Sequence, residues 1–279
     1  MDLLPSANAL APLAGIAAPQ RPARDYHARV MQILAVTNIK GGVGKTTTAV
    51  NLAYLAAASA RRTTLWDLDP QGASTHLLRG EPGIQASAKK LVKGKLDLSE
   101  LIARTSYAGL DLLPADLSYR DFDIHMSERK HRTGQLLKMS VPLRELCDTL
   151  VLDCPPGMSL LSENVLRAAD AIIVPVLPSP LSLRMLEQLY EFAAQSGWTD
   201  RCILPFFSMV DRRKSLHEET IASTRARFPD ILLTEVPYWS EIERMTVRRA
   251  PLPAFAPRSP AAQVYANLWA EITARLPPP

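Results

Sequence analysis

A glycine-rich segment early in the chain combines two lysines with two hydroxyl side chains: Lys-Gly-Gly-Val-Gly-Lys-Thr-Thr at positions 40–47. Glycines here let successive backbone N–H groups converge on a polyphosphate, and a helix starting directly afterwards adds the partial positive charge of its amino end. In such a segment Lys45 would reach the outer phosphates, and the Thr46 hydroxyl would be a magnesium ligand. The residues expected to contact the phosphates are Lys40, Gly41, Gly42, Val43, Gly44, Lys45, Thr46 and Thr47.

The elements around this segment fit that chemistry. An apolar, strand-like run at 33–38 precedes it, and a helix-like run at 48–57 follows. The common pattern G-x-x-x-x-G-K-[ST] requires a glycine at position 39, where this chain has Ile39. A glycine-rich turn without a ligand is the alternative interpretation, but the order strand, loop, helix favours phosphate binding.

Two further apolar runs end in carboxylates. Residues 63–66 precede Asp67 and Asp69, and residues 149–152 precede Asp153. Ligands of parallel α/β sheets bind outside the carboxyl ends of the strands, so acidic side chains there are placed for chemistry. A lone aspartate in such a place is more often a turn former or a helix cap, but the repeated order of strand ends favours a shared site.

The rest of the chain alternates apolar strands with amphipathic helices. Strands are expected at 110–114, 170–176, 202–211 and 232–237, and a closing helix at 259–272. This alternation predicts an α/β fold: a doubly wound, mostly parallel sheet with helices on both faces. We expect one domain over residues 31–276, a flexible Pro/Ala-rich tail over 1–30, and a Pro-rich end at 277–279 that stops the last helix.

Composition excludes some classes of protein. The chain has 279 residues, of which 47% are hydrophobic and 22% charged, enough for a full core. No window is apolar for long enough to span a bilayer. Cys147, Cys154 and Cys202 lie in apolar segments without metal-ligand spacing, which favours buried free thiols in a reducing cytoplasm over a disulfide or a zinc site.

The glycine-rich segment resembles the deviant Walker A motif of the ParA/MinD family of ATPases, whose mark is the extra lysine at the place of Lys40. Residues 67–72, Asp-Leu-Asp-Pro-Gln-Gly, resemble the D-x-D-P-Q-G segment of that family, and Asp153 looks like its Walker B carboxylate. The resemblance covers about residues 31–276. It implies the P-loop NTPase fold of the deviant Walker A class and hydrolysis of ATP to ADP and phosphate, slow without a partner protein.

The resemblance also implies roles for these residues. Lys45 and the loop amides would hold the β and γ phosphates, and Asp69 would orient or activate the attacking water. Asp153, and Asp67 beside it, would hold Mg²⁺ through its water shell, with Thr46 as the direct ligand. The expected catalytic residues are Lys40, Lys45 and Asp69, and the expected metal residues are Thr46, Asp67 and Asp153.

A homodimer follows from the same resemblance. In the family the lysine at the place of Lys40 crosses a dimer interface to touch the phosphates bound by the other subunit, so two ATP molecules lie between two chains. A cation supplied in trans stabilises charge that accumulates in the transition state. An exposed loop lysine without such a role is the alternative for Lys40.

Adenine recognition is expected at two places that match the family. These are the end of the run at 208–211 and the turn after 236–237, and the candidate residues are Met209, Asp211, Pro237 and Trp239. A core or turn role for Met209 and Trp239 is the alternative.

The positive charge of the chain favours polyanions. The net charge is +4 and the sequence pI is near 9.0. ParA-like members bind DNA without sequence preference through basic residues in the carboxyl-terminal part, and the candidates here are Arg213 together with Arg244, Arg248 and Arg249, expected in a loop before the last helix. Glu241 departs from the arginine that relatives carry. Solvated faces are the alternative for these arginines and for the basic runs at 89–95 and 129–132.

Three function classes remain open. The first is a cytoplasmic, nucleoid-associated ParA-like ATPase whose dimer binds non-specific DNA and, stimulated by a ParB-like or other activating adaptor, partitions or positions a plasmid, chromosome or protein assembly. The second is a MinD-like membrane ATPase, disfavoured because residues 265–275 form no basic amphipathic extension, so no stable membrane association is expected. The third is a metabolic enzyme on the same scaffold, such as an amidoligase or reductase.

Overall fold

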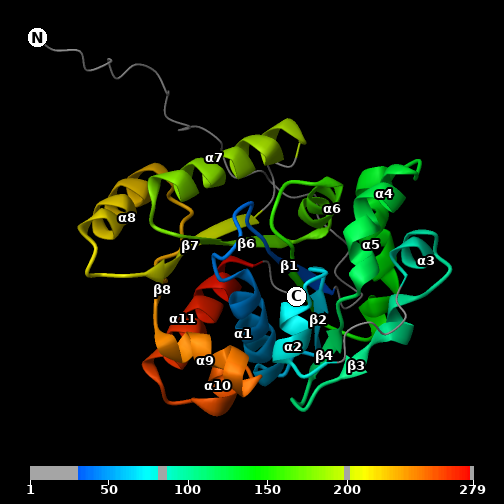
Figure 1. Ribbon diagram of the computed structural model, residues 1–279, viewed down its shortest axis with the longest axis horizontal. Coiled ribbons are helices and arrows are strands. Elements are labelled where there is room, and N and C mark those ends of the chain that lie inside the picture. Colours follow the sequence, from blue (N-terminus) through cyan, green and yellow to red (C-terminus); the bar gives the residue numbers. More distant parts are fainter. Residues whose placement is uncertain (1–30, 81–86, 198–201, 277–279) are drawn as a thin grey trace, which may run out of the picture.

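The computed structural model describes residues 31–80, 87–197 and 202–276. In these residues eight strands form one sheet in the order β3-β4-β2-β5-β1-β6-β7-β8, parallel throughout except for β3, which pairs antiparallel with β4. Figure 1 shows the sheet crossing the middle of the molecule with helices on both of its faces. The predicted fold class is thereby confirmed.

The strands are β1 (Gln32–Val36), β2 (Thr63–Asp67), β3 (Ala103–Arg104), β4 (Leu110–Leu113), β5 (Thr149–Asp153), β6 (Ala171–Val176), β7 (Cys202–Val210) and β8 (Glu235–Pro237). The helices are α1 (Lys45–Ala58), α2 (Ala73–Leu77), α3 (Ala88–Val92), α4 (Phe122–Ser127), α5 (Gln135–Ser140), α6 (Leu160–Ala168), α7 (Pro180–Gln195), α8 (Ser215–Arg227), α9 (Ser240–Arg248), α10 (Leu252–Phe255) and α11 (Pro260–Arg275). Short 3-10 helices lie at Leu98–Leu101, Leu117–Asp121, Arg132–Gly134 and Val141–Glu145.

The central strands are apolar because helices bury both faces of the sheet. Successive side chains of a strand point to opposite faces, so Leu34 and Val36 pack in a cluster that contains α1 and α11 residues. Ile33 and Ala35 pack on the other face, against α3 to α7. The layers therefore leave the ends of the strands as the places where polar groups gather.

The carboxyl ends of β1, β2 and β5 lie level with one another. Asp153 at the end of β5 is in register with Asp67 on one side and with Val36 on the other. The glycine-rich loop (residues 40–44) follows β1 and leads directly into α1. The two carboxylates and this loop therefore share one edge of the sheet.

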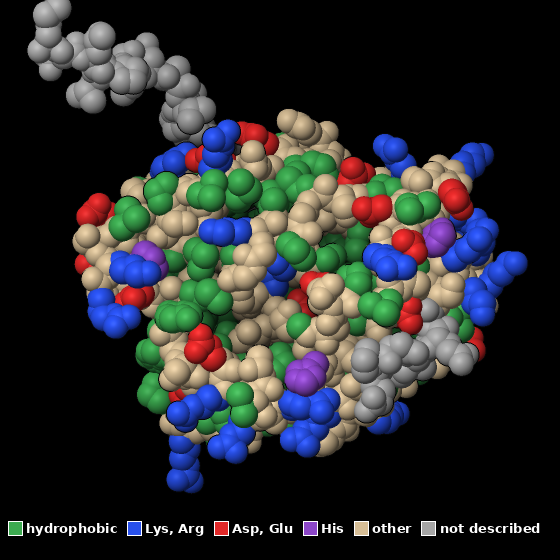
Figure 2. Space-filling model, viewed as in Figure 1, with side chains coloured by type: hydrophobic (Ala, Val, Ile, Leu, Met, Phe, Trp, Pro, Cys, Tyr) green, Lys and Arg blue, Asp and Glu red, His purple; other side chains and the backbone are tan. Residues whose placement is uncertain are grey.

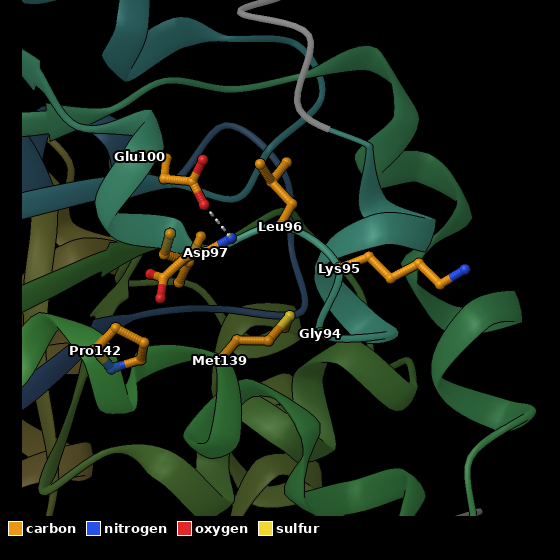
Figure 3. A pocket seen from close by; sticks show the side chains of 8 residues that line it. Gly94, Lys95, Leu96, Asp97, Glu100, Met139 and Pro142 are labelled. Atoms are coloured by element: carbon orange, nitrogen blue, oxygen red, sulfur yellow. Dashed lines mark hydrogen bonds between the residues drawn. The ribbon is translucent and has the colours of Figure 1, made fainter.

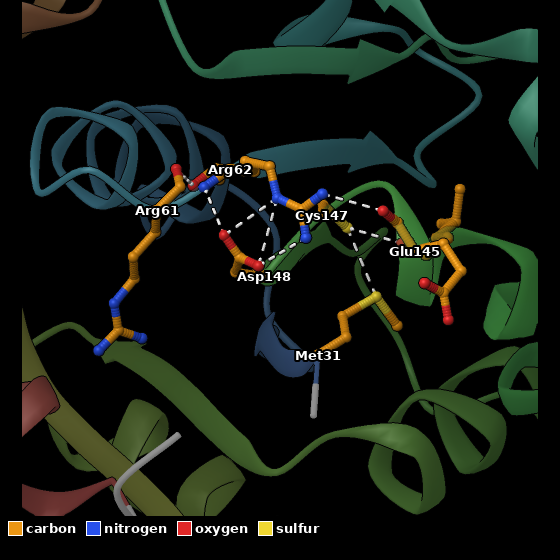
Figure 4. Close-up of polar contacts among 8 residues, drawn as sticks. Met31, Arg61, Arg62, Glu145, Cys147 and Asp148 are labelled. Carbon is orange, nitrogen blue, oxygen red and sulfur yellow. Dashed lines mark hydrogen bonds and ion pairs between the residues drawn. The ribbon is translucent and has the colours of Figure 1, made fainter. Parts of the chain in front are cut away.

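The opposite, amino end of the same strands is closed by structural contacts (Figure 4). The Arg62 guanidinium, just before β2, donates to the Asp148 carboxylate at 2.7 Å and to the carbonyl of Glu145 at 2.9 Å. The Cys147 thiol lies 3.4 Å from the Met31 sulfur. The ion pair is half exposed, so its contribution is below about 1 kcal/mol, and it serves mainly to set the start of β2 beside that of β5.

Three predicted elements differ by three residues in one of their bounds. The helix expected at 48–57 begins at Lys45. The strand expected at 232–237 is confined to Glu235–Pro237, because the Glu271 carboxylate accepts the amides of Leu233 (2.6 Å) and Thr234 (3.0 Å) that a longer strand would use. The closing helix, expected at 259–272, continues to Arg275.

A further prediction was wrong in kind. Arg244 and Arg248 lie on a helix, α9, instead of a loop, because Ile242 and Met245 give residues 240–248 an inward apolar side that packs on the core. Glu241 accordingly lies in the first turn of that helix.

Cys147 and Cys154 are buried free thiols, and Cys202 is half-buried. No helix within the described ranges has the length and apolar character needed to cross a bilayer. The predictions for the tail over 1–30 and for the end at 277–279 fall outside the described residues.

Candidate nucleotide site

The glycine-rich loop adopts a conformation that depends on glycine and leaves a helix end free. Gly42 and Gly44 have φ values of 70° and 87°, and a Cβ on Gly44 would lie 3.1 Å from the Ser208 hydroxyl. Gly44 is the N-cap of α1, which has neither a side-chain cap nor an acidic residue in its first turn. The amino end of α1 therefore presents amides and partial positive charge to any anion in the loop.

Lys45 lies inside the loop. Its side chain is buried, and Nζ donates to the carbonyl of Lys40 at 3.0 Å. Burial lowers the pKa of Lys45, while the carboxylates of Asp153 and Asp69 oppose that shift. Figure 2 shows this face hollowed near its centre, with basic and acidic side chains in the depression. The nearby carboxylates offset only part of the cost of burying the Lys45 charge, so this position favours binding of an anion.

Lys40 points differently. Its backbone amide donates to Asn38 Oδ1 at 2.9 Å, and Asn38 in turn donates to the carbonyl of Pro175 at 2.7 Å, which ties the loop to β6. Lys40 Nζ lies 3.5 Å from Ser182 Oγ in α7. The side chain therefore extends toward α7, away from the loop that Lys45 fills.

Asp67 and Asp153 are fully buried and held by α2. Asp67 Oδ2 accepts the amide of Thr75 at 2.8 Å and its hydroxyl at 2.7 Å, and Asp153 Oδ2 accepts a short hydrogen bond from the Ser74 hydroxyl. Asp153 Oδ1 has no hydrogen-bond partner among the described residues. Burial, the largest cause, raises the pKa of both carboxyl groups, and the charge of Asp67 raises that of Asp153 further.

This donor set fits a divalent cation. The Thr46 side chain lies near the Asp153 carboxylate and opposes the rise in its pKa. Mg²⁺ prefers oxygen ligands and is held in proteins by one or two carboxylates together with phosphates. Asp153 Oδ1, buried and without a partner, is the acceptor that such an ion or its bound water would satisfy.

The buried charge of Asp153 gives a pH-dependent prediction for the metal-free protein. Folding raises the pKa of this carboxyl from 3.8 to about 7, so between these values the folded chain holds a proton that the unfolded chain has lost. The stability that this carboxyl group contributes is present at low pH and is lost as the pH rises through its folded-state pKa. We therefore expect Asp153→Asn to stabilise the protein at pH 8 by about 1–3 kcal/mol, and by much less at pH 5.

Thermal unfolding from pH 5 to pH 8 in the presence of EDTA measures this difference. The exposed Asp230, replaced by Asn, is the matched control and should shift little at either pH. A lower midpoint for Asp153→Asn at pH 8 than for the unchanged chain would show that the carboxylate is not a destabilising buried charge.

Asp69 lies at the same edge, in the turn between β2 and α2. Its amide donates to Asp67 Oδ1 at 3.2 Å, and its own Oδ1 accepts the amide of Gln71 at 3.0 Å. The carboxylate is half-buried and acts on the charge of Lys45. The structure thus brings Lys45, Thr46, Asp67, Asp69 and Asp153 together.

The residues expected near adenine fall into two groups. Met209 sits at the irregularity between β7 and β8 with φ 54°, and its Cε is 3.8 Å from a Cβ placed on Gly44, so it borders the loop. The Asp211 carboxylate is occupied by the Arg213 guanidinium at 2.8 Å, which holds its pKa well below the usual range. Pro237 ends β8, and the side chain of Trp239, the N-cap of α9, is 38% exposed.

The arginines expected to contact DNA also differ from one another. Arg213 pairs with Asp211, whereas Arg244 and Arg248 are exposed and form no ion pair within residues 31–80, 87–197 and 202–276. Arg249 turns inward, and its Nε donates to the carbonyl of His76 at 2.9 Å. We call Arg244, Arg248 and Arg249 the arginine surface; in Figure 2 basic side chains gather along the lower edge, where Figure 1 places α9 and α10.

Sequence reasoning missed Ser74 and Thr75. Both side chains are buried on α2 and hydrogen-bond the carboxylates, yet the only signal in the sequence is a pair of hydroxyl residues shortly after the segment at 67–72.

A second hollow lies between residues 94–100 and the segment 139–142 (Figure 3). Its volume is about 370 Å³. Its polar groups do not converge: Glu100 accepts the amide of Asp97, Asp97 caps Ser99, and Lys95 points away. It has no set of free groups that would hold a ligand.

Comparison with known proteins agrees with this geometry. A family model described as an AAA domain matches residues 31–197. The chain is 31% identical over 269 residues to the chromosome partitioning protein ParA of Caulobacter vibrioides, a match that spans 89% of this chain and 96% of that protein. The chain belongs to the ParA/MinD family of P-loop ATPases.

Two solved structures of similar fold contain bound nucleotide analogues. A putative plasmid partition protein of Borrelia burgdorferi bound to AMPPNP superimposes with a TM-score of 0.77, at 20% identity over 88% of this chain and 100% of that one. A cobyrinic acid a,c-diamide synthase of Mycobacterium smegmatis with bound ATP analogue and magnesium gives 0.73, at 26% identity over 88% and 94%. Nucleotide and magnesium binding thus occurs among the structural neighbours of this ParA/MinD family chain.

Proposed function

We propose that this chain is a ParA-like ATPase that forms an ATP-sandwich homodimer, binds DNA without sequence preference, and positions or partitions a cargo when an adaptor protein stimulates hydrolysis. One observation carries the proposal: a buried lysine, an uncapped helix end and three carboxylates meet at one sheet edge, while the second lysine, Lys40, points away from them. A single chain in this arrangement binds a nucleotide but leaves a cation free for a second chain.

Hydrolysis is assigned to the residues of that edge. Lys45 and the amides of the glycine-rich loop bind and orient the phosphates, and Asp69 positions the attacking water. Thr46 and Asp153, with Asp67 beside it, would hold Mg²⁺, which when bound neutralises negative charge on the phosphate oxygens. Met209, and at the end of β8 Pro237 and Trp239, are proposed to border the adenine; Asp211 is proposed to act there only after its pair with Arg213 opens.

Dimerisation is assigned to the γ phosphate and Lys40. Lys40 is half-buried and its Nζ lies 3.5 Å from Ser182 Oγ of α7, outside the glycine-rich loop. We assign its charge to the phosphates of a partner chain that faces this edge. A contact that depends on the γ phosphate makes the dimer last only as long as ATP does.

DNA binding is assigned to the arginine surface, with Arg213 contributing where Asp211 releases it. Arg244 and Arg248 are exposed and free of acidic partners in the described part of the chain, which suits phosphate contacts. The relative in Caulobacter vibrioides is a chromosome partitioning protein, which supports DNA over a membrane as the matrix. The similarity to a diamide synthase keeps a metabolic enzyme with the same fold as the alternative to a DNA-binding ATPase.

A salt series of DNA binding tests the proposal. We expect the protein with a slowly hydrolysed ATP analogue and Mg²⁺ to bind a random-sequence duplex, with affinity that falls steeply as salt rises. Arg244→Glu/Arg248→Glu should lower that affinity at least tenfold and reduce the slope of log affinity against log salt by about 0.9 for each phosphate that the protein no longer neutralises.

Arg144→Glu is the charge-reversal control, because Arg144 is also exposed but lies in the 3-10 helix Val141–Glu145, outside α9. Fluorescence anisotropy of a labelled duplex measures the affinity, with anionic vesicles as a parallel sample. Absence of DNA binding in every nucleotide state would reject the proposal, and vesicle binding in that case would favour the membrane class.

A further inference from the structure

The carboxyl ends of α2 and α9 meet, and each carries an arginine with unusual backbone geometry. Arg79 follows the end of α2 with φ 59°, and Arg249 is the C-cap of α9 with φ 48°. The left-handed region costs a residue with a Cβ about 1 kcal/mol or more, and glycine is the usual choice at a helix end. Arg79 and Arg249 therefore occupy backbone positions where glycine costs less, so the contacts of their side chains are the feature to examine.

The two guanidinium groups bind the opposite helix reciprocally. Arg79 donates through Nη2 to the carbonyl of Arg248 at 3.2 Å and through Nε to that of Arg249 at 3.3 Å, while Arg249 Nε donates to the carbonyl of His76 at 2.9 Å. Free carbonyls and the negative end of the helix dipole gather at a helix carboxyl terminus, so each guanidinium satisfies the end of the other helix. We call this pair of contacts the arginine clasp.

The other side of α2 holds the carboxylates of the nucleotide site. Ser74 binds Asp153, and the Thr75 hydroxyl donates to Asp67 and accepts the amide of Ala115 at 2.8 Å. Because α2 has only five residues, the carboxylate contacts and the clasp are separated by about one helical turn. The carboxylate contacts and the clasp therefore share one short helix.

Helix α1, which follows the glycine-rich loop directly, contacts α9 by a second route. Asn51 of α1 is fully buried; its amide donates to the carbonyl of Thr47 at 2.9 Å and contacts the Met245 sulfur of α9 at 3.3 Å. Its Oδ1 accepts the amide of Leu252 at 2.9 Å, at the start of α10. The contact between Asn51 and Met245 fixes the inward side of α9. The clasp is the contact that joins the carboxyl end of α9 to α2.

We propose that Arg79 is a positioning residue that couples the nucleotide site to the arginine surface, with α2 and the arginine clasp as the mechanical link. The proposal rests on the function proposed above. A nucleotide with its cation changes the interactions of the carboxylate oxygens of Asp67 and Asp153. Ser74 and Thr75, which hydrogen-bond these oxygens, then shift together with α2. The clasp transmits this shift to Arg248 and Arg249. By reciprocity, DNA held by the arginine surface tightens nucleotide binding by the same factor.

The test compares affinity ratios, which cancel the direct effect of removing a charge. Affinity for a labelled random duplex is measured at one salt concentration with Mg²⁺ and a slowly hydrolysed ATP analogue, and again without nucleotide. We expect the unchanged chain to show a ratio of about 10 or more, and Arg79→Met to show a ratio within about twofold of one. The control Arg144→Met removes a cation elsewhere and should keep the full ratio.

Hydrogen exchange supplies a readout that needs no DNA. Adding Mg²⁺ and the analogue should slow amide exchange in residues 240–252 of the unchanged chain, and in Arg79→Met the slowing should be limited to residues 40–50 and 67–77. Arg79→Lys, which keeps a donor and the charge, should restore part of the response, and because Arg79 and Arg144 are exposed, all three variants should fold. An undiminished response of residues 240–252 in Arg79→Met, or none in the unchanged chain, would overturn the coupling.

The two readouts separate the two proposals. Loss of the exchange response in Arg79→Met, in a protein that binds no DNA in any state, would reject the proposed function and leave the coupling standing. DNA binding with the same nucleotide ratio in Arg79→Met would reject the coupling alone.

Discussion

Replacing Lys45 by alanine is expected to lower kcat/KM for ATP hydrolysis by about a thousandfold. Lys45 is buried in the glycine-rich loop, and within the described residues its side chain donates to the carbonyl of Lys40, an interaction that a phosphate would replace. Removing a cation aimed at developing negative charge in a water-poor site typically costs two to three orders of magnitude. Release of inorganic phosphate at saturating Mg²⁺ across a range of ATP concentrations measures the effect.

The same substitution is expected to leave the nucleotide-free protein no less stable. Burial lowers the pKa of Lys45, so the charged side chain is a cost to the fold until an anion arrives. ATP with Mg²⁺ should raise the melting midpoint of the unchanged chain, as ligands that bind only the folded state do, and this rise should disappear in Lys45→Ala. A fall in stability without nucleotide would mean that Lys45 is structural and that the reduced activity is a folding defect.

The ordered strands of this fold were predictable because burial on both faces leaves continuous apolar runs. Residues 149–153 and 63–67 show this, since every side chain in both strands is buried and each run stops at an aspartate. The glycine-rich loop was equally predictable, because positive φ values at Gly42 and Gly44 restrict the residue types that fit. In such segments local sequence and tertiary structure impose the same requirement.

What the sequence did not reveal depends on contacts between distant segments. The hydroxyl of Ser74 meets Asp153 across 79 positions, and Arg249 meets His76 across 173. Nothing local distinguishes these side chains from solvated ones. The sequence of α9 favours a loop, because its nine residues include two arginines and two glutamates and carry only a short apolar side. Positioning residues of this kind become visible only once the sheet has brought α2 and α9 together.

The division of labour between the two lysines permits a mixing experiment, and its expected effect is the second largest. Lys40→Ala alone should lower hydrolysis at least about a hundredfold while nucleotide binding persists, because its Nζ contacts Ser182 and leaves the loop to Lys45. If Lys40 acts on the partner's phosphates, a heterodimer of Lys40→Ala and Lys45→Ala chains holds one site with both lysines. Random pairing makes half of the dimers in an equimolar mixture heterodimers with one such site of two, and the contact between Lys40 and the γ phosphate, which only heterodimers keep, favours them further. Activity should therefore recover to between about a quarter and a half of that of the unchanged protein.

A lysine that served its own site would give the opposite result. The Lys40→Ala site would then lack its lysine in every dimer, the Lys45→Ala site would lack the other, and the mixture would stay as inactive as either variant. Phosphate release by the two variants, assayed separately and after mixing with ATP and Mg²⁺, distinguishes these cases. Mixing either variant with a chain that carries both substitutions is the matched control: neither mixture creates a complete site under either assignment, so recovery there would point to residual activity of a single chain.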